Sequence, residues 1–285
     1  MPKVRRDAAM MVYNGYTPTE VGRRFGVGSS TICKWVKKAE RIGFHPIPTG
    51  SSRPKHHPKE LNGDLVWKIF HQRMKTKRCA EVIHQELANQ GVKVSLSSVK
   101  RTLDRTGLLK KRSPWKRFHP HVERPLPLFP GDLVQMDTIH LMVDAKKRIY
   151  VYVAIDVYSR WVYAQAYEKI SGRNTLKFVK EAERRASFPF RMLQSDHGPE
   201  FGDWFVEQVK KDHRYTRIGK PNDNSHVERF NRTVQEECLD RVPKHVRALN
   251  SALTEYLRYY NTERLHMGIS LKTPMQLLTG LRPSY

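Results

Sequence analysis

The feature that most constrains the fold is a series of three strand-like segments in the second half of the chain. Residues 133–142, 149–157 and 161–167 are rich in Val, Ile and Tyr, and short polar turns separate them. Strands that follow one another through short turns pair in an antiparallel manner. Helical and strand-like patterns alternate after residue 170. This order, β-β-β-α-β-α-β-α, predicts an α/β layered fold with a mixed sheet.

The later elements of this fold are expected at defined positions. The patterns predict helices at 174–186 and 204–211, strands at 190–194 and 215–218, and a helix that begins near residue 225. Ser171 is expected to cap the first of these helices, and Asn224 or Ser225 the last.

Two more helices are expected beyond residue 241, at 244–261 and 273–278. The first has an apolar face that fits either the core or another subunit. Its apolar residues are Leu249, Leu253, Tyr256, Leu257 and Tyr260.

The front of the chain has a helical pattern instead. Thr17 and Glu20 have the spacing of a capping box around a helix that runs to Phe25. A tight turn at 26–29 then leads to a helix at 30–42, which is the pattern of a helix-turn-helix. An ordinary three-helix bundle with a charged outer face fits the same pattern, but the basic charge favours DNA binding. The candidate DNA-binding residues are Ser29, Ser30, Thr31, Lys34, Lys37 and Lys38.

A second helical unit is expected between residues 58 and 113. Its third helix, capped by Ser95 or Ser97, resembles the recognition helix of a winged helix-turn-helix. The polar side of that helix carries Ser98, Lys100, Arg101 and Arg105. The proline-rich segment that follows contains Lys116 and Arg117, and either a spacer or contact with a DNA backbone fits its composition.

The charge distribution indicates a polyanionic partner. The net charge is +24, and residues 1–131 hold 27 Lys and Arg against 9 Asp and Glu. Such an excess favours nucleic acid, because binding releases the counterions of the phosphates. The three cysteines are scattered, which argues against a disulfide framework and fits a reducing cytosol. No apolar run is long enough to span a membrane, so we expect a cytoplasmic, nucleoid-associated protein without membrane contact.

Three carboxylates mark a candidate metal site. Asp137 lies within one apolar run, Asp196 follows another, and Glu228 lies on the first turns of a later helix. Such a set of oxygen ligands suits Mg2+ or Mn2+, and two ions about 4 Å apart support in-line displacement at phosphorus. Asp137 alone would also fit a structural turn, and Glu228 alone a solvated helix position. A carboxylate in an apolar run is costly unless it is paired or metal-bound, which favours function.

The helix around Glu228 presents further polar groups. Arg232 follows Glu228 at a spacing of four residues and shares its face, so it is a candidate DNA contact. Glu236 lies on the same face and is the fallback third acid, but two turns separate it from Glu228.

Several motifs resemble those of a known enzyme family. They are Q-M-D at 135–137, S-D-H-G-P-E-F at 195–201, P-N-D-N-S-H-V-E-R-F-N-R-T at 221–233 and the tail at 259–274. The core that they mark is similar to the DDE catalytic domain of insertion-sequence transposases and retroviral-type integrases. With the helix-turn-helix units, the resemblance covers most of the chain.

The resemblance implies an RNase H-like core that binds two Mg2+ or Mn2+ ions through Asp137, Asp196 and Glu228. It also implies double-stranded DNA, as element ends and as target, and a homo-oligomer on that DNA. The expected reaction is hydrolysis at the element ends, followed by attack of the freed 3′-OH on target DNA. The predicted organisation is a helix-turn-helix domain at 1–45, a second at 58–113, a basic linker at 114–130, the catalytic core at 131–241 and a C-terminal helical extension at 242–285.

The chain departs from the family pattern at two points. Asp196 and Glu228 are separated by 31 residues, which is fewer than the family commonly has, and His197 stands where Asn is frequent. Two alternatives to an active transposase fit the same sequence. One is a sequence-specific DNA-binding protein with a relic core, and the other is an RNase H-like nuclease that acts on structured nucleic acid. Retention of all three acids argues against the first, and the helix-turn-helix units argue against the second.

Overall fold

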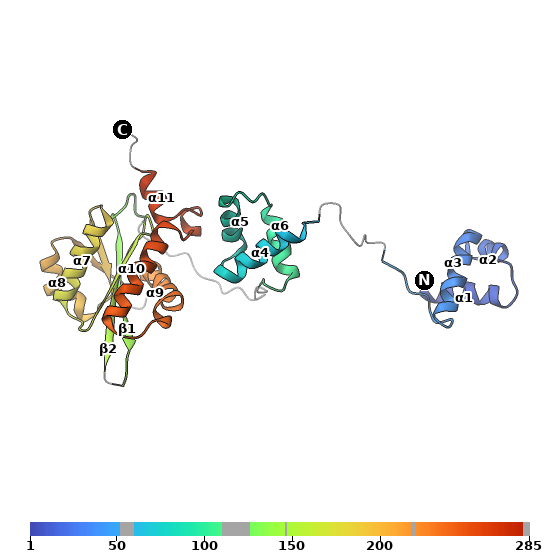
Figure 1. The fold of residues 1–285 in the computed structure, drawn as a ribbon, viewed down its shortest axis with the longest axis horizontal. Coiled ribbons are helices and arrows are strands. Elements are labelled where there is room, and N and C mark those ends of the chain that lie inside the picture. The colour runs from blue at the N-terminus through green and yellow to red at the C-terminus, as the bar shows by residue number, and fades with distance from the viewer. Residues whose placement is uncertain (52–59, 110–125, 146, 218–220, 282–285) are drawn as a thin grey trace. The chain divides into compact units, whose positions relative to one another are not determined.

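The structure is a computed structural model that describes residues 1–51, 60–109, 126–145, 147–217 and 221–281 (Figure 1). The chain divides into two compact units, Met1–Asn62 and Gly63–Tyr285, and each is described by itself. None of the described helices is long and apolar enough to cross a bilayer.

The first unit is a small bundle of three helices. They are α1 (Pro2–Tyr13), α2 (Pro18–Phe25) and α3 (Ser29–Arg41). The predicted capping box is confirmed, since Glu20 N donates to Thr17 Oγ1 at 3.3 Å and Thr17 N donates to Glu20 Oε2 at 2.9 Å. The turn between α2 and α3 is so tight that a Cβ atom on Gly22 would lie 2.6 Å from the Val27 carbonyl oxygen. This geometry is that of a helix-turn-helix with α3 as its second helix.

The second unit begins with three more helices. They are α4 (Gly63–Thr76), α5 (Ala80–Asn89) and α6 (Leu96–Arg105). Of the two caps expected for α6, Ser95 is the one observed, because its hydroxyl accepts from Ser98 N at 3.2 Å. The described residues 63–109 contain no strand that could form the predicted wing, and the segment 110–125 lies outside the described residues.

The remainder of the second unit contains a mixed five-stranded sheet in the order β3-β2-β1-β4-β5. Its strands are β1 (Val134–Met142), β2 (Arg148–Asp156), β3 (Val162–Tyr167), β4 (Met192–Ser195) and β5 (Asp212–Tyr215). As predicted, β1, β2 and β3 pair in an antiparallel meander, whereas β4 pairs parallel to both β1 and β5. This is the sheet expected of an RNase H-like core.

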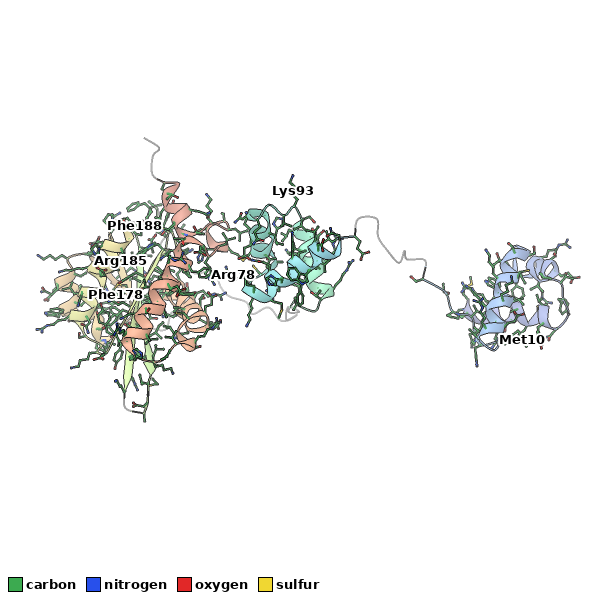
Figure 2. The ribbon with its side chains drawn as sticks, viewed as in Figure 1. Met10, Arg78, Lys93, Phe178, Arg185 and Phe188 are labelled. Atoms are coloured by element: carbon green, nitrogen blue, oxygen red, sulfur yellow. The ribbon has the colours of Figure 1, made fainter. Side chains whose placement is uncertain are left out.

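Helices cover both faces of the sheet (Figure 1). The core helices are α7 (Gly172–Ala186), α8 (Asp203–Val209), α9 (Ser225–Glu237), α10 (Val246–Thr262) and α11 (Pro274–Thr279). One apolar cluster joins the sheet to α7 and α8, and a second joins its other face to α9 and α10. In the first cluster Phe178, labelled in Figure 2, stacks on Tyr163 with ring centroids 5.6 Å apart. The cap of α7 is Ser171, as predicted, which accepts from Asn174 N at 3.2 Å.

Helix α10 belongs to the core by its packing. Its five predicted apolar residues are buried against the sheet, so its apolar face covers the core of its own chain. Two asparagines of α10 also bind the edge strand β3. Asn261 accepts from Val162 N at 3.0 Å and donates to Val162 O at 2.9 Å, and Asn250 makes the same pair of bonds to Ala166 at 2.7 and 3.1 Å. The helix thereby supplies partners that a neighbouring strand would otherwise provide.

The bounds of the last strand were predicted wrongly. The expected strand 215–218 is observed three residues earlier, as β5 at Asp212–Tyr215. The residues Asp-His-Arg-Tyr have little intrinsic preference for a strand, and pairing with Met192–Ser195 determines their conformation instead. Tertiary pairing therefore overrides the local signal at this edge.

Candidate active site

Asp137 projects from β1 toward helix α9. It lies two residues after Gln135, and alternation along a strand places both side chains on the same face. The Asp137 Oδ2 atom accepts a hydrogen bond of 2.7 Å from Asn231 Nδ2, and its Oδ1 atom accepts from Thr138 N at 2.8 Å. The carboxylate is thus fixed by a side chain of the helix that also carries Glu228.

Asp196 lies directly after β4, the strand that runs parallel to β1. Gln135 and Gln194 are register partners in this pair, and each aspartate comes two residues after its glutamine. Because the two glutamines are paired in parallel register, Asp137 and Asp196, each two residues further along, project from neighbouring points. Asp196 itself is exposed, and its Oδ1 atom accepts from Gly198 N at 3.0 Å.

Glu228 lies in the first turn of α9 and is exposed. Partial burial raises the pKa of Glu228, and Arg232 one turn later opposes that rise. Asn231 lies between these two residues and contacts Asp137 directly, so α9 brings Glu228 to the edge formed by the two aspartates.

The electrostatics link the three acids. The pKa of Asp137 is raised to about 6, mainly by burial and in part by the negative charges of Asp196, Glu228 and Glu200, while the hydrogen bond from Thr138 N opposes the rise. Within the described residues, no three His, Cys, Asp or Glu side chains already form a tight metal-binding group. The acids therefore lie close enough to repel one another, although their side chains do not converge on one point. A divalent cation between them would offset the repulsion.

The chemistry of the donors fits such a cation. Asn231 Nδ2 donates a hydrogen bond to Asp137, whereas Asn231 Oδ1 is buried without a hydrogen-bond partner among the described residues. An unpaired buried carbonyl oxygen next to carboxylates is a hard donor of the kind that Mg2+ and Mn2+ accept, directly or through water. The residues present therefore fit a divalent metal ion.

The start of α9 is not capped as predicted. Asn224 occupies the N-cap position but makes no side-chain cap bond, and its Nδ2 donates to Met136 O at 3.1 Å instead. The helix is capped from the sheet, since Gln135 Oε1 accepts from His226 N at 3.1 Å and from Val227 N at 3.2 Å. A partner from β1 replaces the local cap, which no local sequence signal would reveal.

His197, the unusual residue of the second motif, holds the loop after Asp196. Its ring stacks on Tyr215 with centroids 4.7 Å apart, and its Nε2 lies 3.1 Å from Thr216 O. Tyr215 in turn donates to Phe201 O at 2.8 Å. The loop is thereby pinned to β5. The short connection from Asp196 to Glu228 accommodates α8 in seven residues, and residues 218–220 within it lie outside the described residues.

Four residues of the site were not identified from the sequence. They are Gln135, Gln194, Glu200 and Asn231. A usable signal was present for the glutamines, because the pattern Q-x-D occurs in both apolar runs that carry the aspartates, near the start of β1 and at the end of β4. Glu200 is 4% exposed and lies beside Asp196 across Gly198, where a Cβ atom would meet both carboxylates. A buried acid in a loop gives no periodic pattern, so only the fold reveals it.

The candidate DNA-binding residues are mostly on exposed helix surfaces. Ser29, Ser30 and the three lysines of α3 are exposed, and Thr31 is half-buried. On α6, Arg101 and Arg105 are exposed and Ser98 is half-buried, whereas Lys100 forms an ion pair of 2.7 Å with Glu81. Arg232 is exposed on α9. Lys116 and Arg117 lie outside the described residues.

Comparison with known families agrees with this architecture. Residues 129–221 and 210–274 match two models described as "Integrase core domain", and residues 2–47 match a "Homeodomain-like domain". The two core matches together extend through α10, the helix that packs on the sheet.

Individual relatives are distant. The chain is 27% identical to the ORF3 protein of Spiroplasma virus SpV1-C74, assigned as an integrase, over 52% of this chain and 48% of that protein. It is 24% identical to the transposase of insertion sequence IS904 from Lactococcus lactis, over 76% of this chain and 92% of that protein. The chain thus spans about half of the viral relative and nearly all of the bacterial one.

Among solved structures, the chain is similar to the HTLV-2 integrase catalytic core in complex with magnesium. The identity is 23%, the TM-score is 0.42, and the match covers 53% of this chain and 98% of that one. The two integrase core matches together span residues 129–274, about half of the chain, so the chain belongs to the integrase core family, and its sequence is similar to that of an insertion-sequence transposase.

Proposed function

We propose that this protein is a transposase that binds the ends of its mobile element, and that Asp137, Asp196 and Glu228 are the catalytic acids for strand cleavage and strand transfer. Two divalent cations, Mg2+ or Mn2+, are held by these carboxylates. The protein acts as an oligomer on double-stranded DNA in a bacterial cytoplasm, in association with the nucleoid.

The observation that carries this proposal is the bond between Asn231 and Asp137. Asn231 lies within one helical turn of Glu228, so this hydrogen bond holds the Glu228 part of α9 against Asp137 on β1. The raised pKa of Asp137, caused by burial and by the neighbouring acids, supports the same grouping. Neighbouring carboxylates that repel one another destabilise the fold, but they are suitable ligands for a divalent cation.

Each residue has a distinct role in the proposed reaction. Asp137 must lose its proton before it can bind a cation, and Asn231 keeps that carboxylate oriented. Asp196 and Glu228 are exposed, so they can meet a phosphodiester that reaches this edge of the sheet. Bound divalent cations would activate the attacking hydroxyl and offset the charge on the leaving oxygen.

The helical units at the front would deliver the DNA. Their ranges are proposed as 1–45 and 58–113, followed by a basic linker at 114–130 and the core, with the 242–285 helices completing the chain. The exposed serines and lysines at the start of α3 suit contact with base edges and phosphates.

Strand transfer by purified variants tests the proposal. Asp196→Asn and Glu228→Gln are expected to lower Mg2+-dependent strand transfer by at least about a thousandfold, because each removes a charged ligand. Both should bind cognate end DNA as the wild type does. Glu236→Gln is the matched control, since Glu236 is an exposed acid on the same helix.

Three results would contradict the proposal. They are wild-type activity of Asp196→Asn, loss of activity in Glu236→Gln rather than in Glu228→Gln, and tight end binding by a wild-type protein that neither nicks nor joins DNA. The last result would favour the relic-core alternative.

A further inference from the structure

Two buried glutamines connect the strands of the site to the helix of Glu228. Gln135 is 4% exposed and Gln194 is 1% exposed, and the two are register partners on β1 and β4. Each shares a sheet face with the aspartate two residues later. We propose that Gln135 and Gln194 are positioning residues that fix the distance between the two aspartates and Glu228.

The first link is a shared carbonyl oxygen. Asp223 O accepts from Gln135 Nε2 at 2.8 Å and from Gln194 Nε2 at 2.8 Å. A carbonyl oxygen has two lone pairs, and the two amides satisfy both. The residue that precedes the α9 N-cap is therefore tied to both aspartate-bearing strands at one atom.

The second link is the cap of α9. Gln135 Oε1 accepts from the main-chain N–H groups of His226 and Val227, which lie in the first turn, where helical N–H groups have no intrahelical partner. Val227 directly precedes Glu228, so the height of Glu228 along the helix axis is set by an atom on β1. Asn224 adds a third strand contact through Met136 O at 3.1 Å.

The other side of Asp223 is also fixed. Arg217 donates to both carboxylate oxygens of Asp223, at 2.9 and 2.8 Å, and this ion pair holds the pKa of Asp223 at about 2. The side chain of Asp223 is thus held by Arg217, while its carbonyl oxygen binds the glutamines. Gln135 needs a donor and an acceptor at once, which an amide provides and which methionine or an ionised glutamate cannot.

The inference rests on the proposed function for its consequence, namely that displacement of α9 weakens the metal site. Groups that orient metal ligands typically change metal affinity or activity by roughly ten- to a hundredfold when removed. The test uses the full chain as wild type, Gln135→Met, Gln194→Met and the double variant. Asn261→Leu is the matched control, because it removes a buried amide that binds one N–H and one C=O at the far edge of the sheet.

Two readouts separate positioning from general damage. Amide hydrogen exchange of the metal-free protein reports the order of residues 225–228, and electron paramagnetic resonance of free Mn2+ gives the metal dissociation constant. Gln135→Met should raise exchange at 226–227 by at least about tenfold and the Mn2+ dissociation constant by roughly ten- to a hundredfold. Gln194→Met should act in the same direction, and the double variant should be less than additive because both amides share one acceptor. Asn261→Leu should change neither quantity by more than about twofold.

Unchanged exchange and unchanged Mn2+ affinity in folded glutamine variants would overturn the inference, as would an equal effect of Asn261→Leu. Where the Met variants do not fold, Gln135→Asn and Gln194→Asn keep the amide but shorten its reach by one methylene, and the same outcomes apply. A wild type that binds no Mn2+ would overturn the proposed metal site, whereas the exchange data would still decide whether the glutamines hold α9.

Discussion

Side-chain amides hold a helix against the sheet in two regions of the core, at the proposed active site on the central strands β1 and β4 and at the edge strand β3. At the outer edge, Asn250 and Asn261 lie on α10 and bind the backbone of β3. At the site, Gln135 and Gln194 lie on the strands and bind the backbone at the start of α9. In both places amide side chains join a helix to the sheet, but they belong to the helix at β3 and to the strands at the site.

The difference indicates two purposes. Strand β3 has a neighbour on one side only, so its outward N–H and C=O groups need partners, and the asparagines supply them. Strands β1 and β4 each have neighbours on both sides, and their glutamines are not required for the ladder. The outer amides therefore serve stability, whereas the inner amides are proposed to fix the helix that carries Glu228, the proposed third catalytic acid.

The largest expected effect on stability is at the outer edge. Asn261→Leu leaves the buried N–H and C=O of Val162 without these partners, which should lower the free energy of unfolding by about 2–4 kcal/mol. Strand transfer per folded molecule should stay unchanged. Denaturant unfolding measures the free energy of unfolding, and a single-turnover assay without denaturant measures strand transfer.

Asn250→Leu gives a graded comparison. Asn250 is less buried than Asn261, so its substitution should lower the free energy of unfolding by less. Reduced strand transfer by folded Asn261→Leu would contradict the distinction between amides that serve stability at β3 and amides that position α9 at the site.

A smaller effect is expected from Asp137→Asn in the metal-free protein. The pKa of Asp137 in the folded state is about 6, above the value near 3.9 for an unfolded chain, so its ionisation costs folding free energy. The variant should therefore melt a few degrees higher than the wild type above pH 6. The gain should shrink as the pH falls from 6 to 4, because the aspartate then becomes protonated in the folded state. Thermal unfolding across this pH range measures it.

Addition of Mg2+ should stabilise the wild type and not Asp137→Asn. Asp240→Asn, at an exposed position, is the matched control. A variant that melts lower than the wild type at pH 7.5 would mean that ionised Asp137 does not cost folding free energy.

The sequence predicts most of the fold and the three acids, but not what holds them. Periodicity and caps locate the meander, α7 and the capping box of Thr17, because those signals are local. The start of β5 was missed since its residues take their conformation from β4. The cap of α9 was missed because its acceptor, Gln135, is about 90 residues away in the chain. Contacts of this kind depend on tertiary structure, and a single sequence carries no direct signal for them.

The central claim is that Asp137, Asp196 and Glu228 share divalent cations. Anomalous diffraction from Mn2+-soaked crystals of the full chain tests it most directly. The account predicts Mn2+ peaks within roughly 2.0–2.4 Å of carboxylate oxygens from all three residues. Peaks that involve Glu236 instead, or Mn2+ bound while Glu228 points away, would contradict it.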